Sequence, residues 1–214
     1  MSFSIQGKTA VVTGAATGVG LAIARHFADQ GANVVFADMD EKRLDNELGE
    51  IGDESNVRMF AGDLRQKLTI ANLLSATLDA FERVDILVNG SRQMLAADPL
   101  NPDDDAVKAL LDQNLMTSLR LTQLFARRMI KQARDEGKEE GPVGSVINLS
   151  SIAAQRTHPK LLAYSVSSAA LDQLTRSMAV ALAPERIRVN AVAFGSVMSA
   201  SLQGALKEDG DIRE

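Results

Sequence analysis

The 214-residue sequence contains no cysteine and no tryptophan, one tyrosine and two histidines. Without cysteine the chain forms no disulfide, performs no thiol chemistry and binds no metal through thiolates. The histidines, His26 and His158, lie far apart in the sequence and have no companion at metal-ligand spacing. We therefore expect no metal site.

Long apolar runs and blocks of positive charge are also missing. No apolar run approaches the length that spans a bilayer, and the first residues lack a signal-peptide pattern. The formal net charge is −5 without a basic block, which argues against nucleic acid as a partner. We expect a soluble, cytoplasmic protein whose partners include neither nucleic acid nor a membrane.

Apolar strand-like runs alternate with helical patterns along the chain, and the apolar content of 45% is enough for a substantial core. This alternation predicts a single α/β domain spanning residues 1–214, with a three-layer, doubly wound parallel sheet and its ligand over the carboxyl ends of the strands. The predicted strands are 8–13, 33–38, 57–61, 84–89, 144–149 and 187–193, and the predicted helices are 19–30, 40–49, 65–82, 104–135 and 162–182.

A glycine-rich turn follows the first predicted strand. The segment 8–20 reads KTAVVTGAATGVG and places Gly14, Gly18 and Gly20 between that strand and a helix. Gly14 permits unusual backbone angles, Gly18 lets a phosphate approach the main chain, and Gly20 lets helix and strand pack closely. The spacing G-x3-G-x-G is not a P-loop, because no Lys-Ser/Thr follows. Many strand-to-helix turns contain two glycines, so the turn alone leaves nucleotide binding open.

Asp38 ends the second predicted strand, twenty residues after Gly18. An acid at this place accepts hydrogen bonds from an adenosine ribose and repels a 2′-phosphate. Since the glycine turn contains no Arg or Lys, NAD is favoured over NADP. Alternatively, Asp38 caps the following helix, although Asp40 suits that cap better.

Two predicted helices are apolar or small-sided on more than one face. Helix 104–135 carries leucines on several sides, and helix 162–182 is rich in alanine and serine. Burial in the core explains most of this pattern. We additionally predict a homodimer or homotetramer formed through these two helices.

In the second half, the predicted strand 145–149 runs directly into Ser150 and Ser151, and Tyr164 follows thirteen residues after Ser151. At this point the chain resembles the short-chain dehydrogenase/reductase family, over nearly its whole length. The matching pieces are TGAATGVG at 13–20, Asp38, Asp63-Leu64, ILVN at 86–89, Asn114, INLSS at 147–151, Tyr164 and RVNAVAFG at 188–195. Together, in this order, they are highly specific.

The resemblance implies a Rossmann fold, a nicotinamide cofactor and a set of site residues. Tyr164 would be the general acid/base, Ser151 would hold the substrate oxygen, and Asn114 would support a water leading to solvent. Such groups suit a reaction that builds an alkoxide by hydride transfer. The implied cofactor contacts are Gly14, Thr17, Gly18, Val19 and Gly20 for the pyrophosphate turn, Asp38 for the adenosine ribose, Asp63 and Leu64 for adenine, Asn89 and Gly90 for the nicotinamide ribose, and Val197 and Ser199 for the carboxamide.

One departure from the family pattern concerns the motif Tyr-x-x-x-Lys, which here reads YSVSS from Tyr164 to Ser168. Residues four apart share a helix face, so Ser168 stands where the lysine would stand. In the family that ammonium grips the nicotinamide ribose and favours the ionised tyrosine. A free phenol titrates at about 10, and a serine brings a hydrogen bond but no charge. Lys160 or Arg156 would have to supply a replacement cation; otherwise both are solvated loop residues.

Three further departures lie elsewhere in the sequence. The segment 89–92 reads NGSR where the family has Asn-Asn-Ala-Gly, which puts Arg92 at the glycine position. Phe194-Gly195 replaces the usual Pro-Gly. The sequence ends at Glu214, inside the region that forms the substrate lid in the family, so we expect the C-terminal helix and the last strand to be missing from it. Either the chain is truncated or partly ordered, or these parts are absent from the protein.

These observations support two functions. The first is an NAD-dependent oxidoreductase that interconverts a secondary alcohol and a ketone, with impaired turnover because of Ser168. The second is an NAD-binding protein that has lost catalysis and acts as a sensor or subunit partner. The tyrosine at its required position favours the enzyme, and the identity of the small-molecule substrate stays open.

Overall fold

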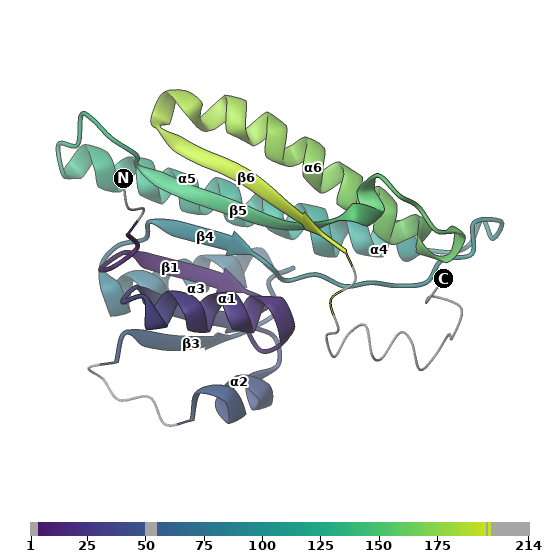
Figure 1. Ribbon diagram of the computed structural model, residues 1–214, viewed down its shortest axis with the longest axis horizontal. Helices are drawn as coiled ribbons and strands as arrows, with labels where there is room; N and C mark the ends of the chain where they lie inside the picture. Colours follow the sequence, from purple (N-terminus) through teal and green to yellow (C-terminus); the bar gives the residue numbers. More distant parts are fainter. Residues whose placement is uncertain (1–3, 50–54, 196, 198–214) are drawn as a thin grey trace.

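A computed structural model describes residues 4–49, 55–195 and 197 of the chain. Its centre is a six-stranded sheet whose paired strands all run parallel, in the order β3-β2-β1-β4-β5-β6 (Figure 1). The strands are β1 (Thr9–Thr13), β2 (Asn33–Asp38), β3 (Val57–Ala61), β4 (Ile86–Asn89), β5 (Gly144–Ser151) and β6 (Ile187–Phe194). The predicted fold class is therefore confirmed.

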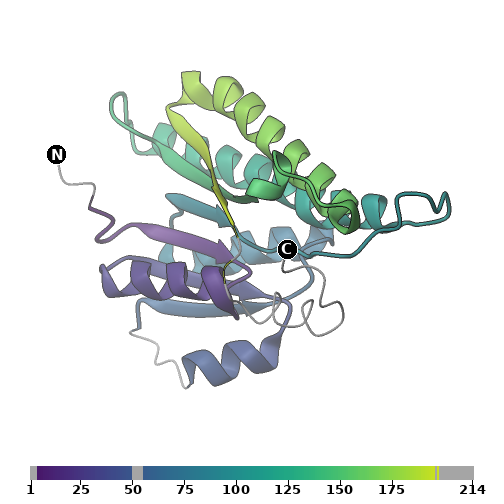
Figure 2. The same ribbon diagram turned by 45° about the vertical axis from the view of Figure 1, so that its right-hand side comes forward.

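Helices cover both faces of this sheet, as Figures 1 and 2 show from two directions. One face packs against α1 (Gly18–Asp29) and α2 (Glu41–Leu48). The opposite face packs against α3 (Lys67–Phe81), α5 (Thr117–Asp135) and α6 (Leu162–Leu182). Each face has its own apolar cluster, so the sheet is the middle of three layers.

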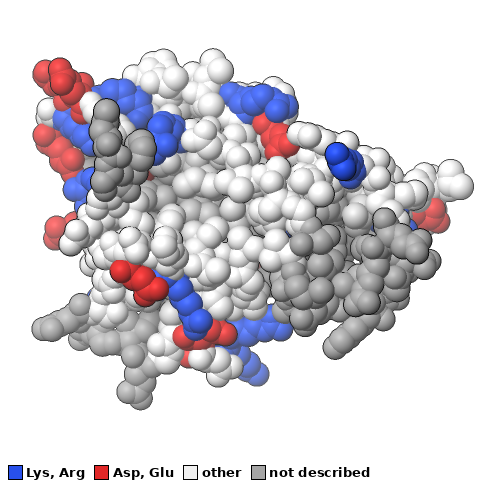
Figure 3. Space-filling view, viewed as in Figure 1, with Lys and Arg blue, Asp and Glu red and all other residues white. Residues whose placement is uncertain are grey.

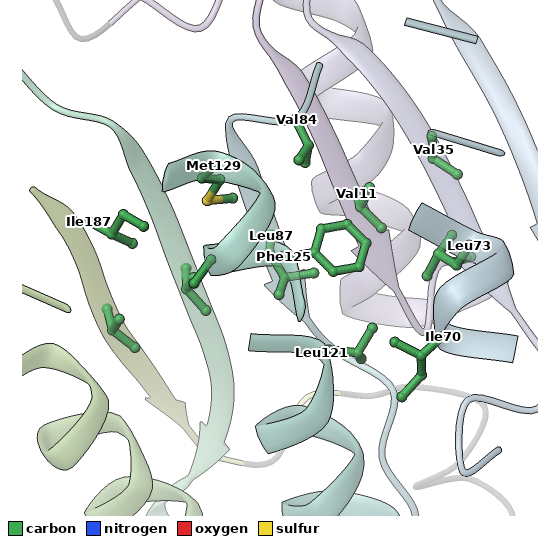
Figure 4. Close-up of a cluster of buried hydrophobic side chains, with 14 of the residues drawn as sticks. Val11, Val35, Ile70, Leu73, Val84, Leu87, Leu121, Phe125, Met129 and Ile187 are labelled. Atoms are coloured by element: carbon green, nitrogen blue, oxygen red, sulfur yellow. The ribbon is translucent and has the colours of Figure 1, made fainter. Parts of the chain in front are cut away.

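Phe125 of α5 lies at the centre of the larger cluster and is fully buried (Figure 4). Leu121 from the same helix, Leu73 from α3, and Val11 and Leu87 from the two central strands surround it. These strand residues are β-branched or leucine side chains in continuous apolar runs, as expected for strands that are buried on both faces. Burial of this cluster fixes the central strands and hence the position of their carboxyl ends.

The strand order reverses between β1 and β4. The helix that follows β1 covers one face, and α5, which follows β4, covers the other, so the two connections diverge and leave a crevice beyond Thr13 and Asn89. In open parallel sheets, ligands bind at such a reversal. The fold thus predicts where a ligand binds before any side chain is considered.

The predicted helix 104–135 is not continuous. It consists of α4 (Ala106–Leu110), a π-helical turn η1 (Leu111–Met116) and α5. A π-helical turn inserts an extra residue into the helix and is frequent at functional sites. Apolar periodicity cannot reveal it, because the pattern continues through both kinds of turn. Strand β5 also extends two residues beyond its predicted end, to Ser151.

Short 3-10 turns complete the described structure: η2 (Ile152–Ala154), η3 (Pro159–Leu161) and η4 (Ala183–Glu185). The first two connect β5 to α6. The expected loss of the C-terminal helix and last strand concerns residues 198–214, which lie outside the described residues.

Across the part of the chain that the structure describes, every helix is too short or too polar to cross a membrane. On the face seen in Figure 3, acidic and basic side chains are interspersed near the periphery, and the middle of the face is largely uncharged. This distribution agrees with the modest net charge of −5.

Candidate active site

The turn between β1 and α1 packs backbone against backbone on the loop that follows β4. Gly14 has φ +70, and a Cβ added there would lie 2.6 Å from the carbonyl oxygen of Gly90. A Cβ on Gly20 would collide with the carbonyl of Gly14. A Cβ on Gly90 would lie 2.5 Å from the carbonyl oxygen of Thr13. Only glycine permits these approaches, so the predicted turn has a definite steric reason.

Thr13 holds the same two segments together, although the sequence did not single it out. Its Oγ1 accepts hydrogen bonds from the N–H groups of Gly90 at 3.0 Å and Ser91 at 3.1 Å. The hydroxyl donates to the carbonyl oxygen of Val88 at 3.3 Å. The signal in the sequence that could have pointed to Thr13 was its place at the end of a buried strand. In the structure its hydrogen bonds hold the ends of β1 and β4 together where the strand order reverses.

The first turn of α1 faces this crevice. Gly18 starts the helix with φ +57, and the preceding Thr17 makes no side-chain capping bond to the helix. The first N–H groups of a helix have no partner within the helix, and together with the helix dipole they attract an anion. A cleft of about 290 Å³ borders these groups, and its walls include Gly14, Thr17, Gly18, Val19, Gly20, Asp38, Gly90 and Phe194. The predicted pyrophosphate residues therefore share one cleft.

Asp38 lies at the end of β2 beside the glycine turn. Its Oδ2 accepts the N–H of Ala16 at 3.1 Å, and its Oδ1 accepts the N–H of Asp40 at 3.1 Å. Asp40 is the N-cap of α2 and accepts the N–H of Arg43 at 3.1 Å. The capping role belongs to Asp40, as expected, while Asp38 braces the turn and lines the cleft.

Asp63 and Leu64, the predicted adenine contacts, do not belong to the residues that line this cleft among those described. Asp63 forms an ion pair with Arg65, with 2.8 Å between Oδ2 and Nη2. The hydrogen bond from this guanidinium lowers the pKa of the Asp63 carboxyl below its ordinary value. The Leu64 side chain is buried in the larger apolar cluster. Their contact with adenine stays a prediction.

Asn89 ends β4 and is buried. Its Nδ2 donates to Thr122 Oγ1 at 3.2 Å and to Asn148 Oδ1 at 2.8 Å. Asn148 in turn donates to Thr175 Oγ1 at 2.8 Å, which donates to the carbonyl oxygen of Leu171 at 2.8 Å. The Oδ1 of Asn89 has no partner among the described residues. A chain of polar side chains thus runs from β4 to α6 and leaves one acceptor free at the site.

Asn114 belongs to the π-helical turn and is also buried. Its Nδ2 donates to the carbonyl oxygen of Gln93 at 2.9 Å and to Ser167 Oγ at 3.2 Å, and its Oδ1 accepts the N–H of Gln93 at 2.8 Å. The π turn therefore carries a side chain, that of Asn114, which joins the loop after β4 to α6. Its role toward a water stays a prediction.

Tyr164 lies in the first turn of α6 and is 7% exposed. It packs with Ala153, Leu110 and Ala163 in a third apolar cluster. Ser168, one turn later, is 5% exposed and lines the same small cavity as Tyr164. The predicted shared helix face is therefore present in the structure, whereas the chemical roles of both residues stay predictions.

Ser151 ends β5, opposite Phe194 of β6 in the sheet register. Its Oγ accepts the N–H of Ala153 at 3.2 Å, which places the serine next to the cluster that contains Tyr164. Val197, a predicted carboxamide contact, is exposed, and Ser199 lies outside the described residues.

Known proteins resemble this chain in sequence over most of its length. Residues 8–210 match the family model described as short chain dehydrogenase. An uncharacterized oxidoreductase of Staphylococcus saprophyticus is 32% identical over 195 residues, which cover 90% of this chain and 80% of the relative. A galactitol 2-dehydrogenase of Agrobacterium fabrum is 33% identical over 195 residues, which cover 90% of this chain and 72% of the relative.

A solved structure shares the fold at higher coverage. It is a 3-ketoacyl-(acyl-carrier-protein) reductase of Brucella melitensis complexed with NADH, with a TM-score of 0.81 and 28% sequence identity. The match covers 94% of this chain and 80% of that one.

Proposed function

The chain belongs to the short-chain dehydrogenase family, and from this premise we propose that it is an NAD-dependent oxidoreductase that interconverts a secondary alcohol and a ketone. The observation that carries the proposal is the cleft in which the glycine turn, Asp38 and the loop after β4 meet. A dinucleotide needs an anion site at a helix N-terminus and, at the end of the neighbouring strand, a hydrogen-bond acceptor for a ribose. Both border this cleft.

The residues of the cleft fit a nicotinamide dinucleotide. The uncapped amides at Gly18 to Gly20 would hold the pyrophosphate in the cleft that these residues border. Asp38 would accept the ribose hydroxyls and repel a 2′-phosphate, which favours NAD over NADP. Asn89 and Gly90, of which Gly90 borders the cleft, would lie beside the nicotinamide ribose.

The bound coenzyme would supply hydride transfer. Tyr164 would pass a proton to or from the substrate oxygen, since a buried phenol is both a donor and an acceptor. Ser151 accepts the amide of Ala153, so its own hydroxyl hydrogen is available to the same oxygen. Asn114 would hold the π turn and a water path between Gln93 and α6.

Ser168 sets the expected efficiency. We infer that it stands at the position of the motif lysine, where it brings a hydroxyl to the site instead of an ammonium. Turnover is then lower than in relatives that carry the lysine, and Ser168→Lys should raise it. Loss of that charge is also the observation that favours the second candidate, a coenzyme-binding sensor or subunit partner without catalysis.

We also propose a domain organisation, a mode of self-association and a cellular location. One domain carries both the cofactor and the catalytic groups, copies associate through helices α5 and α6, and the protein acts in the cytoplasm. The substrate is a small molecule; a polyol, as for the galactitol enzyme, and a 3-oxoacyl compound, as for the Brucella reductase, are the first to test.

Calorimetric titration tests the coenzyme. We expect NADH to bind at least about tenfold more tightly than NADPH, because a carboxylate opposite a phosphate is repulsive. Asp38→Asn keeps the side-chain shape and should narrow this ratio, whereas Asp29→Asn, the same change on an exposed residue of α1, should leave it unchanged. If neither coenzyme binds the folded protein at millimolar concentration, the assignment fails.

A coenzyme-coupled absorbance assay on polyols, 3-hydroxyacyl thioesters and simple secondary alcohols then separates the two candidates. Turnover that Tyr164→Phe abolishes supports the enzyme. Coenzyme binding without turnover on any class, including in the Ser168→Lys variant, supports the binding protein.

A further inference from the structure

Three residues at which the sequence departs from the family pattern meet around Tyr164. The guanidinium carbon of Arg92 lies 5.9 Å from the centre of the Tyr164 ring and 4.4 Å from the centre of the Phe194 ring. Arg92 and Ser168 also line the same small cavity as Tyr164. They come from the loop after β4, from α6 and from the end of β6. Residues that depart from the family pattern at separate places in the sequence are thus neighbours in the structure.

The guanidinium of Arg92 is anchored in this position. Its Nη1 donates to the carbonyl oxygen of Ser150 at 3.2 Å, and the Ser150 hydroxyl donates to Asp172 Oδ1 at 2.6 Å. The ring of Phe194 supports its other side, an arrangement in which a cation is attracted to the face of an aromatic ring. Phe194 therefore provides a contact for the arginine that the usual proline would not.

The cavity beside Ser168 has a volume of about 10 Å³, enough for one water molecule. Its walls include Asn89, whose Oδ1 is buried and has no partner within the described part of the chain. Asn114 and Ser168 line it as well. A water there would donate to Asn89 and reach the Ser168 hydroxyl, so the short serine leaves space for a hydrogen-bond bridge but for no charge.

We propose that Arg92 is a positioning residue that supplies, through Tyr164, the positive charge that the motif lysine supplies in the family. The guanidinium carbon of Arg92 lies 5.9 Å from the centre of the Tyr164 ring. A nearby cation favours the ionised form of a phenol, and a guanidinium is not deprotonated in proteins. The half-buried position of Arg92 limits screening by solvent. The inference rests on the proposed function, because it assigns Tyr164 the proton transfer.

Among the described residues that line the cavity beside Tyr164 and Ser168, Arg92 is the charged one. Arg156 and Lys160, the replacement cations considered from the sequence, are not among the described residues that line it. Nor are the other titratable groups on α6 and on the elements that pack against it, which are Lys108 on α4, Asp112 on η1, His158 before η3, Asp172 and Arg176 on α6, Glu185 on η4, Arg188 on β6, and Arg120, Arg127, Arg128, Lys131, Arg134 and Asp135 on α5.

The test uses Tyr164 as a reporter, since it is the only tyrosine of a chain without tryptophan. The ultraviolet absorbance of the phenolate is followed against pH in the folded protein, with and without NADH, for wild type, Arg92→Gln and Arg156→Gln. We expect Arg92→Gln to move the midpoint upward, because it removes the cation beside the ring. The basic limb of the pH–rate profile should move in the same direction. Arg156→Gln, which removes an exposed arginine, should leave both unchanged.

Rescue variants separate charge from packing. Arg92→Lys should recover most of the shift, because it restores a cation. Ser168→Lys in the Arg92→Gln background should do the same from the position one helical turn after Tyr164. A purely structural arginine predicts neither recovery. Circular dichroism and thermal unfolding verify that each variant is folded.

An unchanged midpoint in folded Arg92→Gln would overturn the inference. If that variant also bound NADH more tightly, Arg92 would be identified as an obstruction of the nicotinamide end. The titration requires no turnover, so a shifted midpoint in a protein that binds no coenzyme would refute the proposed function and leave the electrostatic role intact.

Discussion

At the amino edge of the sheet, just before β4, the buried carboxylate of Asp85 is surrounded by donors; at the carboxyl edge, where β4 ends, the buried Oδ1 of Asn89 has no partner among the described residues. Arg83 binds Asp85 through two hydrogen bonds of 3.0 and 2.8 Å, and the N–H of Thr9 adds a third at 3.0 Å. Arg83 continues to Glu136 at 3.2 Å. The two polar residues are four positions apart in one chain segment.

The difference indicates what each edge does. Burial by itself raises the pKa of Asp85, yet the bonds from Arg83 and Thr9 outweigh it, so the pKa lies below its ordinary value. Such a saturated cluster closes the sheet and has no capacity for a ligand. The free acceptor of Asn89 and the cleft beside the uncapped start of α1 do have that capacity. Substitutions at the two edges should therefore affect different observables.

The largest effect is expected at the carboxyl edge. Gly14→Ala introduces a methyl group 2.6 Å from the carbonyl oxygen of Gly90 at a φ of +70, and should weaken NADH binding at least about 100-fold by calorimetry. Gly137→Ala is the matched control, since φ is +62 there but no heavy atom lies within 4 Å. It should lower stability by about 1 kcal/mol and leave affinity unchanged. If Gly14→Ala bound NADH with wild-type affinity, the carboxyl edge would no longer be distinguished from the amino edge as the place of coenzyme binding.

At the amino edge, Asp85→Asn should lower the free energy of unfolding in urea by about 2 kcal/mol, because the guanidinium of Arg83 loses a partner that is largely buried. NADH affinity should remain that of wild type. Asp135→Asn breaks the exposed pair with Lys131 and should cost less than about 1 kcal/mol. If Asp85→Asn lost as much free energy of NADH binding as free energy of unfolding, the two edges would not be independent.

The smallest effect concerns pH. The folded-state pKa of Asp85 lies below its unfolded value of about 3.9, so its contribution to stability is present above that pH and is lost as the pH falls through the folded-state value. Urea midpoints of wild type and Asp85→Asn should therefore differ by a constant amount from pH 5 to 7 and converge below about pH 4. A constant difference down to pH 3 would mean that the carboxylate is not the stabilising form.

Most of the fold was accessible from the sequence because buried parallel strands read as apolar runs and the glycine turn separates β1 from α1. The interruption of helix 104–135 was not, since apolar periodicity is the same on both sides of the π turn at Leu111–Met116. That turn decides the position of Asn114, so the sequence predicted the residue but not the geometry that holds it.

The site shows the same division. Gly14, Asp38 and Ser168 follow from spacing along one strand or helix, which is local information. The contacts of Arg92 with Tyr164 and Phe194 join segments about 70 to 100 residues apart, and no pattern along the chain encodes them. Arg156 and Lys160 were considered as replacement cations because they are near Tyr164 in sequence, whereas the contact of Arg92 with the Tyr164 ring appears only in the folded chain.

Arg92, Ser168 and Phe194 lie on three different segments, and none belongs to the cluster around Phe125 that determines the sheet. Phe194 packs against the apolar cluster beneath α1 and α2, whereas Arg92 and Ser168 belong to neither cluster of the sheet. Exchange of Arg92 or Ser168 should therefore alter the surroundings of Tyr164 while the three layers keep their packing, so this corner of the molecule can be redesigned independently of its scaffold.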